Sequence, residues 1–186
     1  MAANATQHRS VRALCEGAIM VALAQILAYL KLYELPQGGS ITLAMVPIFF
    51  FAVRWGWKKG LGCAFVFGLL QLLLDGGFAI GWQSMLGDYL IAFGVLGLAG
   101  IFTGKPYSIF AGTVARFLVH WVVGATIWAE YMPDEFFGMT MTSPWIYSAL
   151  YNGSYMLPDM IVSLVVFAVL YVPLKKYLLG EDLKQA

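Results

Sequence analysis

Three side chains that could bind or position a ligand share one otherwise apolar stretch, RFLVHWVVGATIWAEY. Arg116, His120 and Trp128 recur with Gly124 every four residues, so they lie on one face of a helix. Asp88 is a further ionisable residue in an apolar run, and no basic residue is expected at its depth. Ionisable groups inside a membrane usually face a cavity or a partner. A carboxylate beside aromatic rings suits a flat organic cation, through charge pairing, cation–π contacts and stacking.

Other polar side chains fall at the same depth of the chain's later helices. Tyr89 follows Asp88. Tyr147 lies one turn into the last apolar run, and Asn152 lies one or two turns deeper. The same face of that run carries Ser148, Tyr151 and Tyr155. Tyrosine and asparagine fix the orientation of a ligand by hydrogen bonds. The shared depth predicts a pocket that opens to the outside of the membrane.

Trp128 and His120 also have ordinary explanations. Trp128 lies near the end of a span, where tryptophan is common in the interfacial belt. A single histidine such as His120 often caps a neighbouring carbonyl. Arg116 lies deeper than the others, and we expect it to pair with Asp159, just after Pro158, and to close the pocket floor.

The composition indicates an all-α integral membrane protein. Of the 186 residues, 61% are hydrophobic and 11% are charged, whereas soluble domains are about half apolar and about a quarter charged. A net charge of +1 provides no basic field for nucleic acid. The apolar runs predict a single membrane domain over residues 1–186 with six transmembrane helices in the lipid bilayer, at about 12–32, 41–56, 60–74, 84–103, 109–131 and 144–177.

Basic residues decide the predicted orientation. In the six-helix arrangement they fall on one side of the membrane at Arg9, Arg12, Arg54, Lys58, Lys59, Lys105, Lys175, Lys176 and Lys184. Only Lys31 falls on the other side. The positive-inside rule therefore places both termini in the cytoplasm. Pro158 should kink the last helix.

A small-residue face on the first helix suggests a second, protein-binding surface. Ala18 and Ala22 are four residues apart, as are Ala24 and Ala28. This spacing lets another helix approach closely. Packing inside the chain is the more common reason for such spacing, and the spacing alone does not establish a partner surface.

Motifs for catalysis and for cofactors are absent from the sequence. It contains no Walker A loop, no GxSxG and no HExxH, and its two histidines are far apart. We therefore expect no enzyme activity, no catalytic residue, no cofactor and no metal site.

Several stretches together resemble the ThiT family, the thiamine-specific substrate-binding subunits (S-components) of energy-coupling factor (ECF) transporters. They are EGAIMVALA (16–24), GGSITLAMVPIFFFAVRWGWKKG (38–60), GDYLIAFGVLGLAG (87–100), the opening stretch and YSALYNG (147–153). The resemblance implies the six-helix S-component fold and capture of thiamine from outside. It also implies docking, through Ala18 and Ala22, to a transmembrane coupling subunit that works with two cytoplasmic ATPases.

The resemblance also assigns roles to individual residues. It places the substrate-binding residues at Asp88, Tyr89, Arg116, His120, Gly124, Trp128, Tyr147 and Asn152. Asp88 would attract the thiazolium cation, Trp128 and His120 would stack on or flank the ligand, and Tyr147 and Asn152 would orient the pyrimidine.

The chain departs from the family pattern at a few positions. Asp88 stands where the family usually has glutamate, so its reach is one methylene shorter. Arg116 stands where the family has lysine. The loop ELPQGGS offers only Tyr33 as a lid aromatic, and Phe78 stands where an aromatic of the next outer loop is expected.

The predicted function is high-affinity thiamine binding by a subunit of an ECF-type importer in the bacterial plasma membrane. Two alternatives stay open. One is a stand-alone secondary transporter of thiamine or another organic cation, with proton coupling through Asp88. The other is an S-component for a different vitamin, because the fold is shared.

Overall fold

The computed structural model describes residues 2–35, 38–74 and 79–183. In chain order its helices and strands are α1 (Ala2–Tyr29), β1 (Tyr33–Glu34), β2 (Ser40–Ile41), α2 (Met45–Trp55), α3 (Trp57–Leu74), α4 (Trp82–Ser84), η1 (Met85–Ile91), α5 (Ala92–Gly94), η2 (Val95–Gly100), η3 (Pro106–Ser108), α6 (Ile109–Thr126), η4 (Ala129–Tyr131), β3 (Glu135–Phe136), β4 (Met139–Thr140), α7 (Pro144–Leu178) and η5 (Glu181–Leu183).

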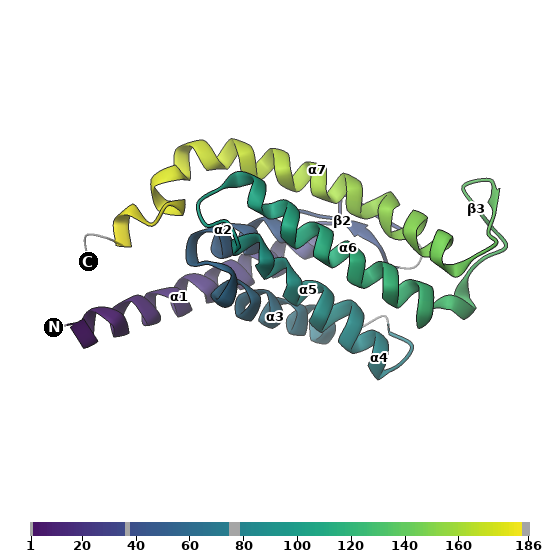
Figure 1. Ribbon diagram of the computed structural model, residues 1–186, viewed down its shortest axis with the longest axis horizontal. Coiled ribbons are helices and arrows are strands. Elements are labelled where there is room, and N and C mark those ends of the chain that lie inside the picture. The colour runs from purple at the N-terminus through teal and green to yellow at the C-terminus, as the bar shows by residue number, and fades with distance from the viewer. Residues whose placement is uncertain (1, 36–37, 75–78, 184–186) are drawn as a thin grey trace.

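The helices form one elongated bundle, with both ends of the chain at the same end of it (Figure 1). Within the described residues, four helices are long and apolar enough to cross a membrane, and Met45–Trp55 is a shorter apolar helix. The run from α4 to η2 completes the six helical segments expected of a multi-pass membrane protein. The side of the membrane on which the termini lie remains a prediction.

Some element boundaries differ from those expected. α1 begins at Ala2, and α2 begins only at Met45 because Ser40–Ile41 pairs with Tyr33–Glu34 in a short antiparallel hairpin. α6 ends at Thr126, before a separate 3₁₀ turn. α7 continues through Pro158 and Pro173 as one helix of 35 residues, so neither proline ends it.

The fourth segment is the least regular part of the bundle. It changes from α-helix to π-helix in η1, back to α-helix in α5 and then to 3₁₀-helix in η2. Glycines let this segment pack closely on α3: a Cβ at Gly97 would overlap the backbone of Leu61. The span predicted at about 84–103 is therefore helical over Trp82–Gly100, but it is not a regular α-helix. The π-turn carries Asp88 and Tyr89, two of the predicted substrate-binding residues.

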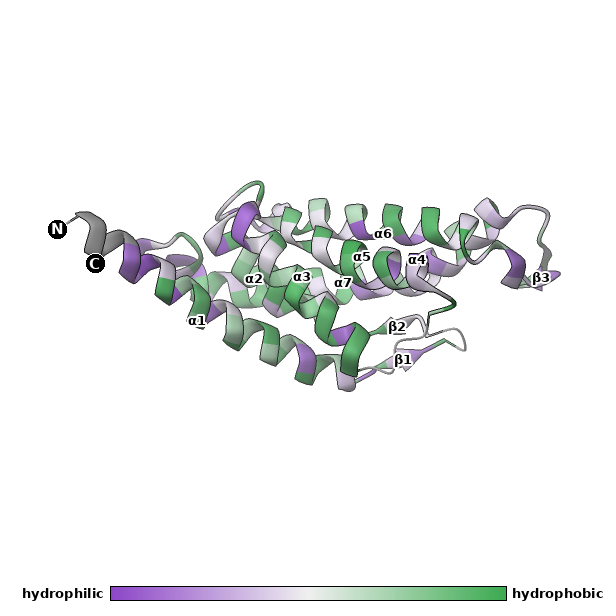
Figure 2. Ribbon diagram, turned by 90° about the horizontal axis from the view of Figure 1, so that it is seen from below, coloured by the Kyte–Doolittle hydropathy of each residue, from purple (hydrophilic) through white to green (hydrophobic). Residues whose placement is uncertain are grey.

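The apolar core lies between α2, α3, η2 and α7. Its largest fully buried apolar side chains include Phe49, Phe67, Phe167, Met45, Ile48 and Leu96. Hydrophobic residues predominate along the long helices (Figure 2), and many large apolar side chains are exposed on the outside of the bundle. Leu14 and Val172, for example, are 74% and 75% exposed, as expected of side chains that contact lipid.

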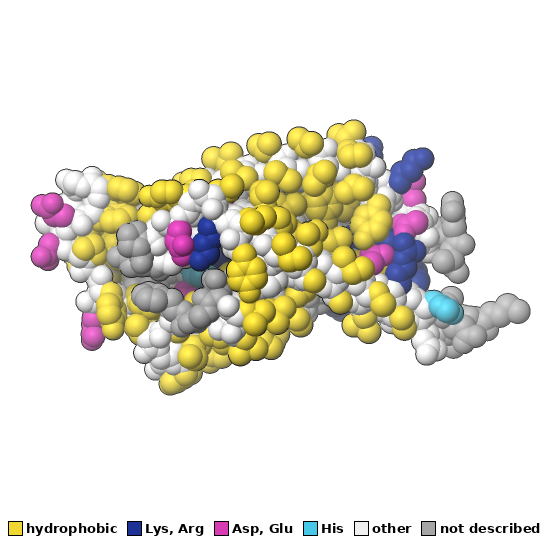
Figure 3. Space-filling model, turned by 180° about the vertical axis from the view of Figure 1, so that it is seen from behind, with side chains coloured by type: hydrophobic (Ala, Val, Ile, Leu, Met, Phe, Trp, Pro, Cys, Tyr) yellow, Lys and Arg dark blue, Asp and Glu magenta, His cyan; other side chains and the backbone are white. Residues whose placement is uncertain are grey.

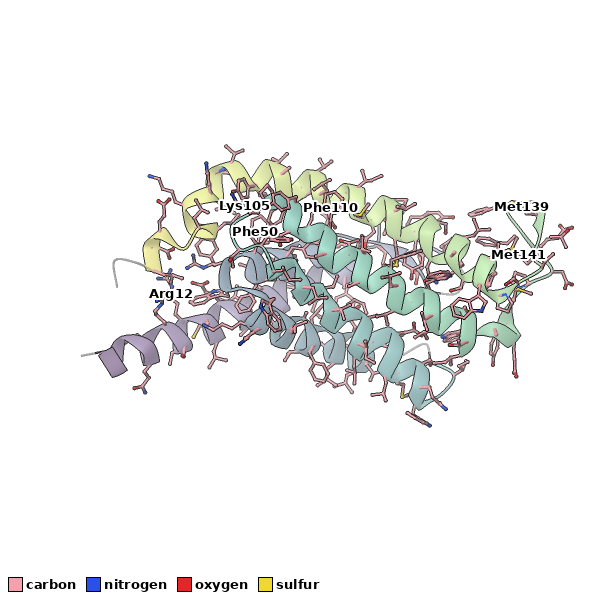
Figure 4. The ribbon with its side chains drawn as sticks, viewed as in Figure 1. Arg12, Phe50, Lys105, Phe110, Met139 and Met141 are labelled. Atoms are coloured by element: carbon pink, nitrogen blue, oxygen red, sulfur yellow. The ribbon has the colours of Figure 1, made fainter. Side chains whose placement is uncertain are left out.

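A charged cluster ties α1, α2 and η5 together near the chain ends. The side chain of Arg54 is fully buried, and its Nε lies 2.7 Å from Glu16 Oε2. Asp182 accepts hydrogen bonds from both terminal nitrogens of Arg54, each at 2.9 Å. Arg12, labelled in Figure 4 beside this end, also binds Glu16 and Asp182. The cluster fixes the C-terminal turn against the first two helices.

Candidate ligand site

A cavity of about 170 Å³ opens in the half of the bundle away from the chain ends. Figure 3 shows the molecule hollowed there, with a histidine side chain inside the hollow. One ordered water needs only about 10–15 Å³ by this measure, so the cavity has room for much more than a structural water. The opposite end of the bundle carries the charged cluster described above.

All eight predicted substrate-binding residues line this one cavity. They are Asp88, Tyr89, Arg116, His120, Gly124, Trp128, Tyr147 and Asn152. The four-residue spacing in α6 and just beyond it does bring its members to one face, and η1 and α7 supply the others. Their part in binding a ligand remains a prediction.

The carboxylate of Asp88 receives one hydrogen bond on each oxygen. His120 Nδ1 lies 2.8 Å from Oδ1, and Trp128 Nε1 donates to Oδ2 at 2.8 Å. The family resemblance implies that both rings stack on or flank the ligand, and this stays a prediction. The ring N–H groups bind Asp88, and the ring faces remain available to a ligand.

A chain of polar contacts continues from His120 to the cavity floor. Arg116 Nε donates to His120 Nε2 at 3.4 Å, so Nδ1 carries the proton that His120 donates to Asp88. Arg116 Nη1 lies 3.8 Å from Asp159 Oδ2, and the predicted pairing of these two residues is confirmed. Asp159 also accepts a hydrogen bond from the backbone N–H of Thr42 at 3.1 Å.

These contacts define the charge of the cavity. Arg116 and Asp159 offset each other. The hydrogen-bond partners of Asp88 are an indole and an imidazole whose second nitrogen is an acceptor, so both are uncharged in this arrangement. Among the described residues, Asp88 is therefore a cavity carboxylate with no cationic partner, a setting that favours a positively charged ligand.

The side-chain amide of Asn152 forms hydrogen bonds with other residues of the protein. Its Nδ2 donates to Ser148 O at 2.9 Å, and its Oδ1 accepts from the Tyr155 hydroxyl at 2.8 Å. Gly124 faces this group: a Cβ there would overlap Ser148 Oγ. Ser148 thus occupies the space beside Gly124, and Gly124 allows the close approach of α6 and α7. These bonds favour Asn152 as a residue that positions Tyr155.

Aromatic rings form much of the remaining wall. Along α7, the ring centroids of Tyr147 and Tyr151 lie 5.8 Å apart, and those of Tyr151 and Tyr155 lie 5.7 Å apart. Tyr131 packs edge-on against Trp128, with a centroid distance of 5.6 Å. Such a wall offers flat faces for stacking and for cation–π contacts.

The structure adds lining residues that the sequence did not indicate. They are Gly38, Gly39 and Ser40 between α1 and α2, Gln71 of α3, Phe93 of α5 and Tyr131 of η4. Gln71 is an amide in an otherwise apolar helix, and that contrast was the available signal. Tyr33, considered as a lid aromatic, is 59% exposed and is not among the lining residues. Phe78 lies outside the described residues.

The small-residue pairs of α1 have different surroundings. Ala24 and Ala28 are buried in the core, whereas Ala18 and Ala22 are exposed on the outside of the bundle. Packing inside the chain therefore explains the first pair and leaves the second pair open for a partner. Among the described residues, no group of three or more histidine, cysteine or acidic side chains could hold a metal ion.

Comparison with known proteins agrees with this architecture. Residues 14–179 match the family model described as thiamine transporter protein (Thia_YuaJ). The chain is 32% identical to thiamine transporter ThiT of Bacillus subtilis (strain 168), over 94% of this chain and 98% of that protein. It is 27% identical to thiamine transporter ThiT of Lacticaseibacillus paracasei, over 95% and 94% respectively.

A solved structure shares the fold. The structure of ThiT from Listeria monocytogenes superposes with a TM-score of 0.77 at 22% identity, covering 94% of this chain and 98% of that one. The family model matches most of the chain, and the six helical segments with their span-length apolar helices agree with it. This chain belongs to the thiamine transporter family of multi-pass bacterial membrane proteins.

Proposed function

We propose that this chain binds thiamine from the outer side of the membrane and serves as the substrate-binding subunit of an ECF-type importer. The single observation that carries the ligand assignment is the unpaired charge of Asp88, whose two hydrogen-bond partners, His120 and Trp128, are uncharged. The thiazolium ring of thiamine carries a fixed positive charge that would compensate it. The work of the chain is binding and delivery, without bond chemistry.

The cavity wall suits both rings of thiamine. Trp128 and the row of tyrosines on α7 provide faces for two flat heterocycles. Tyr147, 8% exposed, lines the cavity where its hydroxyl can orient a polar ring. The family match and the relatives named as thiamine transporters support the same ligand.

The partner surface is proposed on α1. Ala18 and Ala22 are exposed, four residues apart, and let a helix of another subunit approach closely. On this basis the partner is the transmembrane coupling subunit, which two cytoplasmic ATPases drive. Both termini are then cytoplasmic, on the side where the ATPases lie.

Reconstituted vesicles test the transport part of the proposal. We expect thiamine uptake only when the coupling subunit, the ATPases and ATP are present. Vesicles that contain this chain alone and take up thiamine under a proton gradient would support the stand-alone secondary transporter instead.

Bulky substitutions test the docking surface. Leucine at both Ala18 and Ala22 should leave thiamine binding intact and abolish ATP-driven uptake. Ala168→Leu makes the same change at an exposed position of α7 and should leave uptake unchanged. Equal ATP-driven uptake by the Ala18/Ala22 double variant and by Ala168→Leu would mean that the partner surface lies elsewhere.

A further inference from the structure

Two buried glutamines form a pair at the cavity wall. Gln71 of α3 is 6% exposed and Gln25 of α1 is 7% exposed. Gln71 Nε2 donates to Gln25 Oε1 at 2.8 Å. Gln71 also lines the cavity, so one end of its amide is held by α1 while the side chain borders the ligand space.

The pair does not satisfy its own hydrogen-bonding groups. Gln25 Nε2 is buried with no hydrogen-bond partner among the described residues. Over the same part of the chain, no hydrogen bond reaches Gln71 Oε1, the carbonyl oxygen of the lining residue. A buried amide with open groups is destabilising, and apolar side chains would fill the same space without that cost. The pair therefore calls for an explanation beyond packing.

The open carbonyl differs from the other polar groups of the cavity. Both oxygens of Asp88 already accept hydrogen bonds, and both ends of the Asn152 amide are engaged. Gln25 accepts from the amino group of Gln71, so the free group of Gln71 is an acceptor. It matches a hydrogen-bond donor on the ligand.

We propose that Gln71 recognises the exocyclic amino group of the bound aminopyrimidine and that Gln25 is the positioning residue that orients its amide. This inference rests on the proposed function, because thiamine supplies the amino group. In an analogue that carries an oxo group in place of the amino group, the oxo oxygen would face Gln71 Oε1. Both oxygens are acceptors, so they would repel each other. Gln71 is then a determinant of specificity for the amino form.

Binding of the two ligands to purified full-length protein tests the proposal. Wild-type protein should bind thiamine at least about tenfold more tightly than the oxo analogue, as expected for a site built around one hydrogen bond. Gln71→Met keeps a similar length and removes the acceptor. It should lower thiamine affinity about fivefold or more, so that thiamine and the oxo analogue bind with nearly equal affinity. Gln25→Met should give an intermediate preference.

Two further variants serve as controls. Gln71→Glu retains an acceptor oxygen and should keep the preference for thiamine over the oxo analogue. This variant tests the role of the acceptor even where Gln71→Met does not fold. Gln83 is exposed in α4, and Gln83→Met should match wild type.

The outcomes separate the two levels of the proposal. Wild-type protein that binds neither ligand contradicts the proposed function itself. The role of Gln71 is overturned by thiamine binding without preference over the oxo analogue, by an unchanged preference in Gln71→Met, or by loss of preference in Gln71→Glu. Tighter binding of the oxo analogue would mean that Gln71 presents its amino group, and it too overturns the assignment.

Discussion

Replacing Asp88 by asparagine removes a carboxylate that has no cationic partner among the described residues, and it keeps the size of the side chain. Two unit charges about 4 Å apart attract each other by about 4 kcal/mol at an effective dielectric constant of about 20. Asp88 is only 17% exposed, so solvent screening removes part of this attraction rather than all of it. We expect a loss of about 1.4 to 4 kcal/mol in thiamine binding, which is about tenfold to a thousandfold in Kd.

The substitution has a second effect that must be separated from the first. Asparagine offers one acceptor oxygen, whereas both His120 and Trp128 now donate to Asp88. One of these donors loses its partner, and the resulting destabilisation affects the free and the bound protein alike. Thermal unfolding without ligand measures that part independently.

A neutral isostere of thiamine, with carbon in place of the quaternary nitrogen, isolates the charge effect. Titration of wild type and Asp88→Asn in detergent with both ligands gives four dissociation constants. The variant should lose affinity for thiamine and keep most of its affinity for the neutral isostere. Equal losses for both ligands, or unchanged thiamine affinity, would refute charge compensation by Asp88. Asp88→Glu keeps the charge and should bind thiamine within about tenfold of wild type.

Three other substitutions test how the cavity and bundle are held. Gly124→Ala places a methyl group where α7 packs and should destabilise the protein by about 1–3 kcal/mol, whereas Gly153→Ala, with open space around it, should be neutral or slightly stabilising in a thermal unfolding assay. Arg116→Ala, Asp159→Ala and the double variant form a double-mutant cycle. Their free energies of unfolding should show a coupling of about 0.5 kcal/mol or more. Additive losses of stability would exclude a functional pair. Arg54→Met removes the buried cation of the charged cluster, leaves Glu16 and Asp182 with only Arg12 as a cationic partner among the described residues, and should cost about 1–3 kcal/mol of stability; an unchanged unfolding temperature would contradict the role given to the charged cluster.

The sequence predicts the parts of the fold that depend on hydrophobic runs and helical periodicity. α6 is a regular helix, so a spacing of four residues reliably placed Arg116, His120 and Gly124 on one face. Arg116 and Asp159 could be paired because each is an ionisable group at similar depth in apolar surroundings, where an unpaired charge is costly.

The fourth segment could not be predicted in the same way. Its π-turn changes the direction of Asp88 and Tyr89 relative to an α-helix, and the turn depends on packing against other helices. π-turns are rare and frequently lie at functional sites, but an apolar run such as this one does not indicate where they occur.

The remaining differences arise from contacts between distant segments. Hydrophobic periodicity does not show that Gln71 borders the cavity, because only the packing of α3 against the other helices brings it there. Nor does it show that His120 and Trp128 share Asp88 as an acceptor. The exposure of Ala18 and Ala22, against the burial of Ala24 and Ala28, likewise requires the three-dimensional arrangement.

Fluorescence titration of thiamine-free protein tests the central claim most directly, because Trp128 lies in the cavity wall and its emission should respond to a stacked ligand. We predict saturable quenching by thiamine with one site per chain, no quenching by riboflavin or biotin, and a weakened response in Asp88→Asn. Absence of thiamine binding, or saturable binding of another vitamin instead, would contradict the account.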